Sequence, residues 1–143
     1  MLNTERAYVF ADPFGRVDSG VSSYVANATN LLARHGLRAD VVTRRPSEAL
    51  TTYRRRLAKA VVDIRHSHWS IVVEAPESDA ATADIPSNAA EIHIRLHCSR
   101  QLGAFVQGER ICTKSLALEQ REIRRAARIS APSRLAVIYS CAM

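Results

Sequence analysis

Apolar residues in the first 43 positions switch from the pattern of a strand to that of a helix and back again. Residues 7–11 (AYVFA) are a short continuous apolar run that ends in an Asp-Pro pair, which is typical of a strand buried on both faces. An amphipathic helix pattern follows, with Asp18 or Ser19 available as its cap and Gly36 as its stop. Residues 37–43 (LRADVVT) then form a second strand pattern. A strand, a helix and a strand in so short a span favour a parallel pair joined by a right-handed crossover.

The same alternation continues through the rest of the chain. It predicts helices over residues 47–64 and 113–127 and from about Ser133, strands over residues 70–76, 91–98 and 128–133, and a loop over residues 77–90. The helix over residues 113–127 is expected to turn Leu116, Ile123 and Ala127 inward. The strand over residues 91–98 places Ile92, Ile94 and Leu96 on one side and Arg95 and His97 on the other. We therefore expect one α/β domain over residues 1–143, with a Rossmann-like, doubly wound and mainly parallel sheet and helices on both faces.

Composition and charge limit the function classes without choosing among them. With 143 residues, 47% of them hydrophobic, the chain has enough apolar side chains for the core of one domain. No apolar run approaches the ~20 residues of a membrane span, and the start MLNTERAYVF lacks the order of a signal peptide, so we expect a cytoplasmic protein. A net charge of +6 permits an anionic partner such as a phosphate group, nucleic acid or an acidic membrane face.

The carboxyl ends of the predicted strands supply the candidate site residues. In a doubly wound sheet, ligands bind beyond these ends. The residues found there are Asp12 to Gly20, Glu74 and Pro76, His97, and Ser130 to Ser133.

Residues 14–23 (FGRVDSGVSS) nearly form a P-loop. A P-loop needs a lysine to neutralise the terminal phosphates, and Val21 stands in its place, so an ATPase is not expected. The Gly-x-Gly-x-x-Gly of a dinucleotide-binding loop is absent as well. What remains is Gly20 at the start of a helix, whose free N–H groups and dipole favour an anion. The alternative is that Gly20 only lets the loop enter the helix without a clash.

Several segments follow one another in an order that is informative as a whole. After the first strand come DSGVSSYVANATNLLARHGLRADVVT, VVEAP, HIRLHC and LEQREIRRAARISAPSR. From Tyr8 to about Ser140, this order and spacing resemble the amino-terminal domain of the family 4 glycosyltransferases of GT-B fold. That family has a Gly-Gly-Val or similar loop after its first strand and a later strand that ends in a Leu-His pair. One departure is Ser19, which stands where the family has the first glycine of its pair.

The resemblance implies a domain that holds the acceptor and forms one wall of a cleft. Gly20, with the N–H groups of Val21 and Ser22, would approach the diphosphate of a nucleotide-sugar donor. His97 would lie near the reacting sugar as the catalytic residue. The residues expected to line the cleft are Asp12, Ser19, Glu74, Ser130 and Ser133. The resemblance implies no metal and no cofactor, because helix ends and basic side chains neutralise the leaving diphosphate in this family.

The domain that binds the donor in this family has no room after Met143. We therefore expect transfer to a glycan, lipid-linked or small-molecule acceptor only through a completed cleft, since both halves must hold donor and acceptor together. Three interpretations stay open. The chain is a subunit completed by another chain or by a homo-oligomer, a truncated reading frame, or a non-catalytic Rossmann-like module that binds an anion or a protein.

Four remaining features carry expectations of their own. The basic run over residues 53–59 (YRRRLAK) suits either a solvated helix face or peripheral contact with the inner face of a membrane. Nucleic acid is not an expected partner, because aromatic and basic residues do not interleave. The histidines lack the spacing of metal ligands, so no metal site is expected. We expect Cys98 to be a buried strand thiol and Trp69 to lie in the core or at its edge.

Overall fold

The computed structural model describes residues 6–15, 19–110 and 112–134. The strands are β1 (Arg6–Asp12), β2 (Arg38–Thr43), β3 (Ser70–Pro76), β4 (Glu91–Arg95) and β5 (Arg128–Ser130). The helices are α1 (Gly20–Arg34), α2 (Leu50–Arg65), α3 (Arg100–Gln107) and α4 (Thr113–Arg125), with a 3₁₀ turn, η1, over Ser78–Ala80. The helix expected from about Ser133 lies almost wholly outside the described residues.

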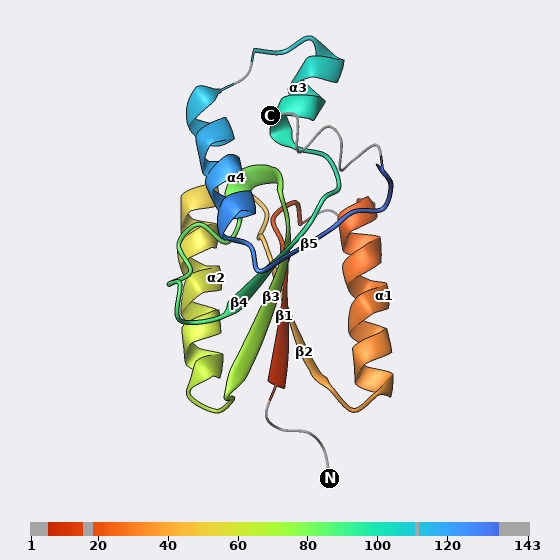
Figure 1. Ribbon diagram of the computed structural model, residues 1–143, viewed down its shortest axis with the longest axis vertical. Coiled ribbons are helices and arrows are strands. Elements are labelled where there is room, and N and C mark those ends of the chain that lie inside the picture. The colour runs from red at the N-terminus through yellow and green to blue at the C-terminus, as the bar shows by residue number, and fades with distance from the viewer. Residues whose placement is uncertain (1–5, 16–18, 111, 135–143) are drawn as a thin grey trace.

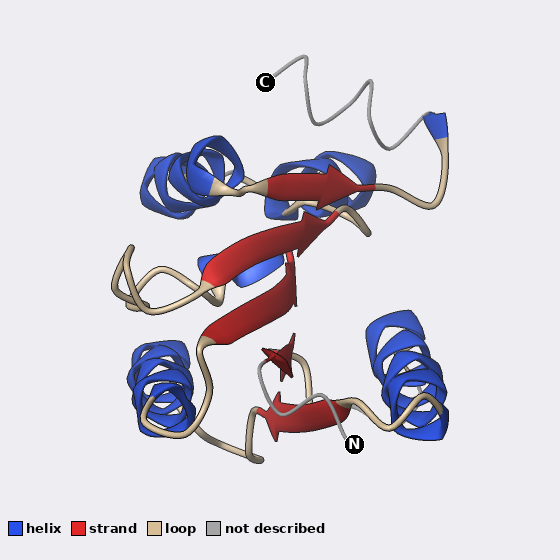
Figure 2. Cartoon of the chain, turned by 60° about the horizontal axis from the view of Figure 1, so that its bottom comes forward, coloured by secondary structure: helices blue, strands red, loops and turns tan. Residues whose placement is uncertain are grey.

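The five strands form one sheet, in which every neighbouring pair is parallel and the order is β2-β1-β3-β4-β5 (Figures 1 and 2). The predicted α/β class and doubly wound parallel sheet are confirmed. This is the strand order of flavodoxin-like sheets, in which the chain reverses its direction of winding between β1 and β3. The crevice at the carboxyl ends of β1 and β3 is therefore the place where such a fold binds a ligand.

Helices cover both faces of the sheet. α1 lies on one face and α2 and α4 lie on the other, while α3 stands beyond the carboxyl ends of the strands (Figure 1). The larger core lies on the α2 side, where Val9 and Val73 pack in one cluster with Leu57. The smaller core lies on the α1 side and joins Phe10 to Val21. β1 is thus buried on both faces, as its continuous apolar run predicts.

Strand β4 and the loop after it show the predicted alternation. The side chains of Ile92, Ile94 and Leu96 are buried, whereas those of His93, Arg95 and His97 are only half-buried. The polar set faces α1, where Tyr24 contacts both Arg95 and His97. Because β4 ends at Arg95, His97 belongs to the loop at the carboxyl end of the strand.

Helix α3 has no counterpart in the sequence prediction. Ser99 caps it, with an Oγ that accepts the Leu102 N–H at 3.1 Å, and Gly108 ends it in the left-handed conformation. The helix has only eight residues and leaves Phe105 and Val106 exposed. Leu102, Phe105 and Val106 follow helical spacing, but a segment of about two turns is too short for this pattern to be distinctive in the sequence.

Two other positions differ from the sequence expectation. Trp69 is 86% exposed, because it lies in the turn between α2 and β3, where Arg65 donates a hydrogen bond to its backbone oxygen. Helix α4 ends before Ala127, which is exposed. The helix buries Glu119 and Glu122 instead, because both carboxylates accept hydrogen bonds from the loop after β3.

Gly15→Ala is expected to destabilise the fold more than Gly108→Ala. Both glycines adopt the left-handed conformation, with φ of 61° and 67°, which costs a residue with a Cβ about 1–2 kcal/mol. Only at Gly15 would the new Cβ also lie 2.2 Å from a backbone oxygen, that of Arg44. Urea unfolding of the wild type and both variants measures the difference. Equal losses of stability would contradict the close packing of the Gly15 turn on Arg44.

Candidate functional site

Asp12 fixes the connection between β1 and α1. Its carboxylate is 4% exposed, and Oδ1 accepts the N–H groups of Phe14 and Gly15 at 3.2 Å each. Oδ2 accepts the Ser22 hydroxyl at 2.9 Å. All of these bonds lie within the connection, so Asp12 shapes the loop that leads into α1.

In the first turn of α1, two backbone N–H groups have no partner among the described residues. Ser19 caps the helix, because its Oγ accepts the Ser22 N–H at 3.0 Å. The N–H groups of Gly20 and Val21 have no hydrogen-bond partner among the described residues. The sequence resemblance assigns the N–H groups of Val21 and Ser22 to a diphosphate, and the Ser19 cap uses that of Ser22. Among the described residues, the N–H groups of Val21 and Gly20 stay available to a ligand.

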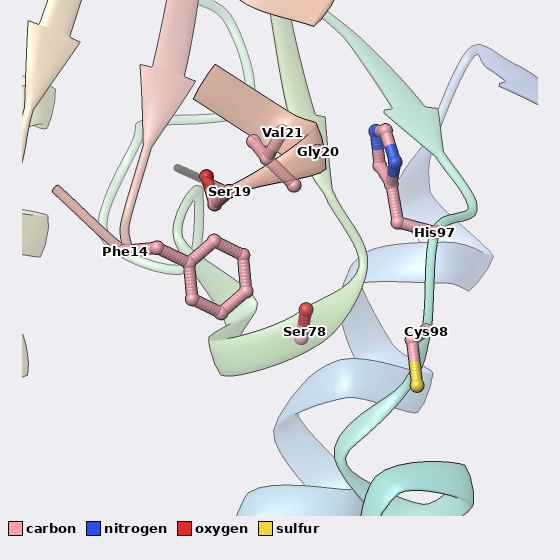
Figure 3. Close-up of a pocket in the computed structure, with 7 residues that line it drawn as sticks. All are labelled: Phe14, Ser19, Gly20, Val21, Ser78, His97 and Cys98. Atoms are coloured by element: carbon pink, nitrogen blue, oxygen red, sulfur yellow. The ribbon is translucent and has the colours of Figure 1, made fainter. Parts of the chain in front are cut away.

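A cleft of about 390 Å³ opens beside this turn, at the reversal between β1 and β3 (Figure 3). We call it the switch-point cleft. It is lined by Phe14, Ser19, Gly20, Val21, Ser78, His97 and Cys98. The segments after β1, β3 and β4 all contribute, and the volume lies within the range of small-molecule pockets, about 300–1,000 Å³.

Neither backbone conformation nor packing within the described protein requires a glycine at position 20. Gly20 is not among the residues with positive φ, and a Cβ added to it would meet no atom within 4 Å. The alternative that Gly20 lets its loop enter the helix without a clash concerns residues 16–18, which lie outside the described residues. Because Gly20 lines the cleft, its missing side chain leaves room for a ligand to approach the backbone.

Ser78 places a buried hydroxyl without a partner in the same cleft. The residue is 4% exposed, and its Oγ has no hydrogen-bond partner in the described part of the chain. Figure 3 shows this hydroxyl pointing toward the space between Gly20 and His97. A buried polar group without a partner costs about 1–3 kcal/mol, and most such groups in proteins are satisfied. The Ser78 hydroxyl therefore indicates a position for a polar atom of a ligand.

His97 lies across the cleft from α1 (Figure 3). Its backbone N–H donates to both carboxylate oxygens of Glu77, at 2.8 and 3.0 Å. Neither nitrogen of its ring has a hydrogen-bond partner among the described residues. Burial and then the positive charge of Arg95 lower the pKa of His97 below 6.5, so the imidazole is neutral at neutral pH. A neutral imidazole offers one donor and one acceptor, which suits a hydroxyl group.

Buried Glu119 ties together two of the loops around the cleft. Its Oε1 accepts the Asp79 N–H at 3.0 Å, and both of its oxygens accept the Arg100 N–H at 3.3 Å. The loop after β3 is thereby joined to the start of α3, and an ion pair between Arg100 and Asp79 at 3.0 Å joins them a second time. Burial raises the pKa of Glu119 to about 7 and also raises the pKa of Glu77.

A second cleft, of about 410 Å³, adjoins the first. It shares Phe14, Ser78 and Cys98 with the switch-point cleft and continues between α3 and α4. Its further lining residues are mostly polar or charged, among them Ser99, Arg100, Gln107, Glu109, Arg110 and Ser115. A ligand in the switch-point cleft can therefore extend past Ser78 into a polar recess.

Four of the predicted site residues line the switch-point cleft, namely Ser19, Gly20, Val21 and His97. Ser22 and Asp12 instead bond to each other inside the β1–α1 connection. Glu74 accepts the hydroxyl of a tyrosine of α1 at 2.5 Å. Ser130 and Ser133 lie at and after β5, on the far side of β4 from β3, and do not line this cleft.

Sequence reasoning missed Phe14 and Ser78 as individual site residues. Ser78 lies two positions after the end of β3, so its place at a strand end was a usable signal. The prediction for Cys98 was wrong. Cys98 is exposed at the cleft, because β4 ends at Arg95 and the chain leaves the sheet before it reaches the thiol.

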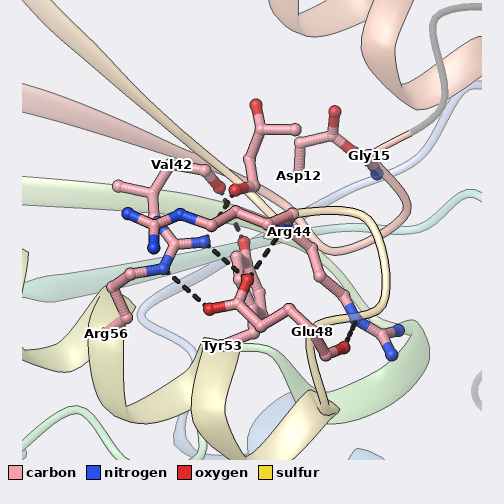
Figure 4. A network of polar contacts seen from close by, with 9 residues as sticks. Asp12, Gly15, Val42, Arg44, Glu48, Tyr53 and Arg56 are labelled. Atoms are coloured by element: carbon pink, nitrogen blue, oxygen red, sulfur yellow. Dashed lines mark hydrogen bonds and ion pairs between the residues drawn. The ribbon is translucent and has the colours of Figure 1, made fainter.

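The basic run of α2 is largely engaged within the protein. Arg54 donates two hydrogen bonds to the backbone oxygen of Asp79, at 2.5 and 3.2 Å. Arg56 pairs with Glu48 at 2.8 Å (Figure 4) and is the main cause that lowers the pKa of Glu48 to about 2. Lys59 pairs with the aspartate four residues further along. Three of the four cations of the run therefore have partners. As a separate finding, no helix in the described ranges has the length and apolar character of a membrane span.

Comparison with known proteins identifies no relative of the chain. No family model, no curated protein and no solved structure matches it. No group of three or more possible metal ligands occurs among the described residues. The functional conclusion therefore depends on the geometry of the switch-point cleft and on the resemblance of the sequence segments.

The unfolding free energy of Glu119→Gln is expected to increase relative to that of the wild type as the pH rises. The folded state raises the pKa of Glu119 from 4.5 to about 7, so its contribution to stability is fully present below pH 4.5 and is lost as the pH rises through 7. A glutamine cannot ionise, so the difference in unfolding free energy between variant and wild type should grow by about 1–3 kcal/mol between pH 5 and pH 8.

Urea unfolding at several pH values measures this difference. The exposed Glu109→Gln is the matched control and should leave the pH dependence of stability unchanged. A constant difference between Glu119→Gln and the wild type across this range would contradict the burial of the Glu119 carboxyl.

Proposed function

We propose that the switch-point cleft binds the diphosphate of a nucleotide sugar and that the chain is the acceptor-side half of a glycosyltransferase. The diphosphate would lie against the N–H groups of Gly20 and Val21, and the His97 imidazole would face a sugar hydroxyl. The acceptor is a glycan, a lipid-linked sugar or a small molecule. The sequence resemblance suggests the class of ligand, and the cleft geometry is compatible with it.

The observation that carries the proposal is the convergence of three unused hydrogen-bond donors on one cleft. These are the Ser78 hydroxyl and the N–H groups of Gly20 and Val21, none of which has a partner among the described residues. Backbone donors at the positive end of a helix are a common means of binding phosphate in α/β proteins. The buried Ser78 hydroxyl adds a donor from a second segment, so the site does not depend on the helix terminus alone.

The cleft supplies hydrogen bonds but little positive charge. None of its described lining residues is a lysine or an arginine, although a diphosphate carries several negative charges. A helix terminus contributes the equivalent of about half a unit charge. Among the described residues, Arg100 and Arg110 supply positive charge in the adjoining cleft, and a donor domain on a partner chain or a homo-oligomer would supply the remainder.

A second candidate is a non-catalytic module that binds a phosphate-bearing ligand in the same cleft. The flavodoxin-like strand order favours it, because such sheets bind phosphate compounds at this switch point without a second domain. Purification of the chain from its source cells, followed by a sugar-transfer assay, separates the two candidates. Transfer by a complex with a donor-domain chain supports the first, and a chain that binds ligand alone without transfer supports the second.

Gly20→Ala and Gly20→Val are expected to weaken binding in the order of side-chain size while the fold stays intact. A Cβ at this position meets no protein atom, but it would occupy the space in which a phosphate approaches the N–H groups. Isothermal calorimetry with UDP, GDP and ADP measures the effect, and we expect a loss of at least about tenfold for valine. Gly103→Ala in α3, whose Cβ would only meet Cys98 Sγ at 4.0 Å, is the control. Unchanged affinity in Gly20→Val would contradict the proposal.

Ser78→Ala is expected to have opposite effects on stability and on binding. Removal of a buried hydroxyl that lacks a partner should raise the unfolding free energy by up to about 1 kcal/mol. Loss of the donor should weaken nucleotide diphosphate binding by about three- to tenfold. Thermal unfolding and calorimetry of the same samples give both numbers. A variant that is less stable and binds as well as the wild type would show that the hydroxyl serves the fold.

A further inference from the structure

Tyr24 of α1 contacts His97, a lining residue of the switch-point cleft, and two further polar side chains, those of Glu74 and Arg95. Its hydroxyl donates to Glu74 Oε1 at 2.5 Å. The guanidinium carbon of Arg95 lies 4.1 Å from the centre of the tyrosine ring. The His97 ring meets the Tyr24 ring edge-on, with 5.8 Å between centres and an angle of 63° between planes. The four residues come from α1, β3, β4 and the loop after β4, so the cluster joins four segments of the chain.

The contacts fix the Tyr24 ring in one orientation. Burial and then the hydrogen bond to Glu74 raise the pKa of Tyr24 to about 12, so its hydroxyl stays protonated and remains a donor. The stacking of Arg95 over the ring adds a cation–π contact, which holds the ring at a second point. A tyrosine held both at its hydroxyl and over its ring is a rigid support for a neighbouring side chain.

His97 needs such a support. The carboxylate of Glu77 holds its backbone N–H, but no described residue bonds to either nitrogen of its ring. The edge-on contact with Tyr24 is the aromatic contact that limits how the imidazole turns. The direction in which the His97 nitrogens face the cleft therefore depends on where Tyr24 lies.

We propose that Tyr24 is a positioning residue that holds the His97 imidazole at the switch-point cleft, with Glu74 and Arg95 fixing Tyr24 in turn. The inference rests on the proposed function, because it assumes that His97 meets the sugar of the ligand. In this arrangement Glu74 acts on the ligand only indirectly, through Tyr24 and His97. The charged groups that face His97 are Arg95 from β4, Glu74 from β3 through Tyr24, and Glu77 from the loop after β3.

The test compares Tyr24→Phe and Tyr24→Leu with the wild type by NMR of the His97 ring protons in the full chain without ligand. Phenylalanine keeps the ring contact and loses the bond to Glu74, whereas leucine loses both. We expect Tyr24→Leu to abolish the nuclear Overhauser contacts between the two rings, to move the His97 ring signals toward those of exposed His66, and to raise the pKa of His97 toward 6.5 as the ring becomes hydrated. Tyr24→Phe should retain most of the ring contacts.

Unchanged His97 signals and pKa in Tyr24→Leu would overturn the inference. Glu74→Leu is a second route if Tyr24→Leu does not fold, because it releases the Tyr24 hydroxyl and leaves His97 itself intact. We expect Glu74→Leu to broaden or shift the His97 ring signals, and identical signals would likewise overturn the positioning role.

Binding measurements on the same samples separate this inference from the proposed function. The probes are UDP, GDP and ADP and their glucose esters. We expect Tyr24→Leu to weaken binding of the glucose ester about three- to tenfold and to leave binding of the bare diphosphate unchanged, because His97 is placed toward the sugar. Equal losses for both probes would contradict the positioning role. Failure of the wild type to bind any probe would remove the proposed function, while the ring-proton data would still decide whether Tyr24 positions His97.

Discussion

Hydrogen bonds from loop backbone to buried glutamate carboxylates hold the walls of the switch-point cleft in place. Glu77 accepts the N–H of His97 after β4, and Glu119 accepts the N–H groups of Asp79 after β3 and of Arg100 at the start of α3. Backbone groups buried outside regular structure need such partners, because an unpaired buried N–H is costly. Without the two carboxylates, these backbone N–H groups would lose their acceptors, and the loops that carry Ser78 and His97 would lose a direct link to each other.

The connection from β3 to β4 explains why so many polar groups are buried on this side. It crosses without a regular α-helix, and Asp79 and Ala80 adopt positive φ within it. Its carbonyl groups therefore need donors from neighbouring elements, which Arg54 of α2 and Arg125 of α4 supply. The Ser78 hydroxyl differs from these carbonyl groups, because it has no hydrogen-bond partner among the described residues at the point where the loop meets the cleft. A buried donor without a partner beside several paired groups of the same loop is more consistent with a binding site than with poor packing.

Sequence periodicity predicted the architecture well because β1 and β3 bury nearly continuous apolar runs, β4 alternates, and the two long helices carry one apolar face each. Sequence reasoning also placed Gly20 and His97 at the same edge of the sheet, because the carboxyl ends of the strands meet there in a parallel sheet. The roles of Glu77, Glu119 and Ser78 depend on contacts between residues far apart in sequence, for which local patterns carry no signal. Helix α3 was missed because its apolar period extends over only eight residues, and the exposure of Trp69 was missed because large apolar side chains are usually buried. The assignment to a glycosyltransferase half stays a prediction from the sequence resemblance.

Both proposals depend on the switch-point cleft as the ligand site. A titration of the isotope-labelled chain with UDP, GDP and ADP, followed at each backbone amide, measures ligand binding there. We expect one of these ligands to shift the amide signals of Gly20, Val21 and Ser78 together and to leave those of the exposed basic face around Arg55 unchanged. Shifts confined to that basic face, or no saturable shift at the three cleft residues with any of the ligands, would contradict the proposed ligand site.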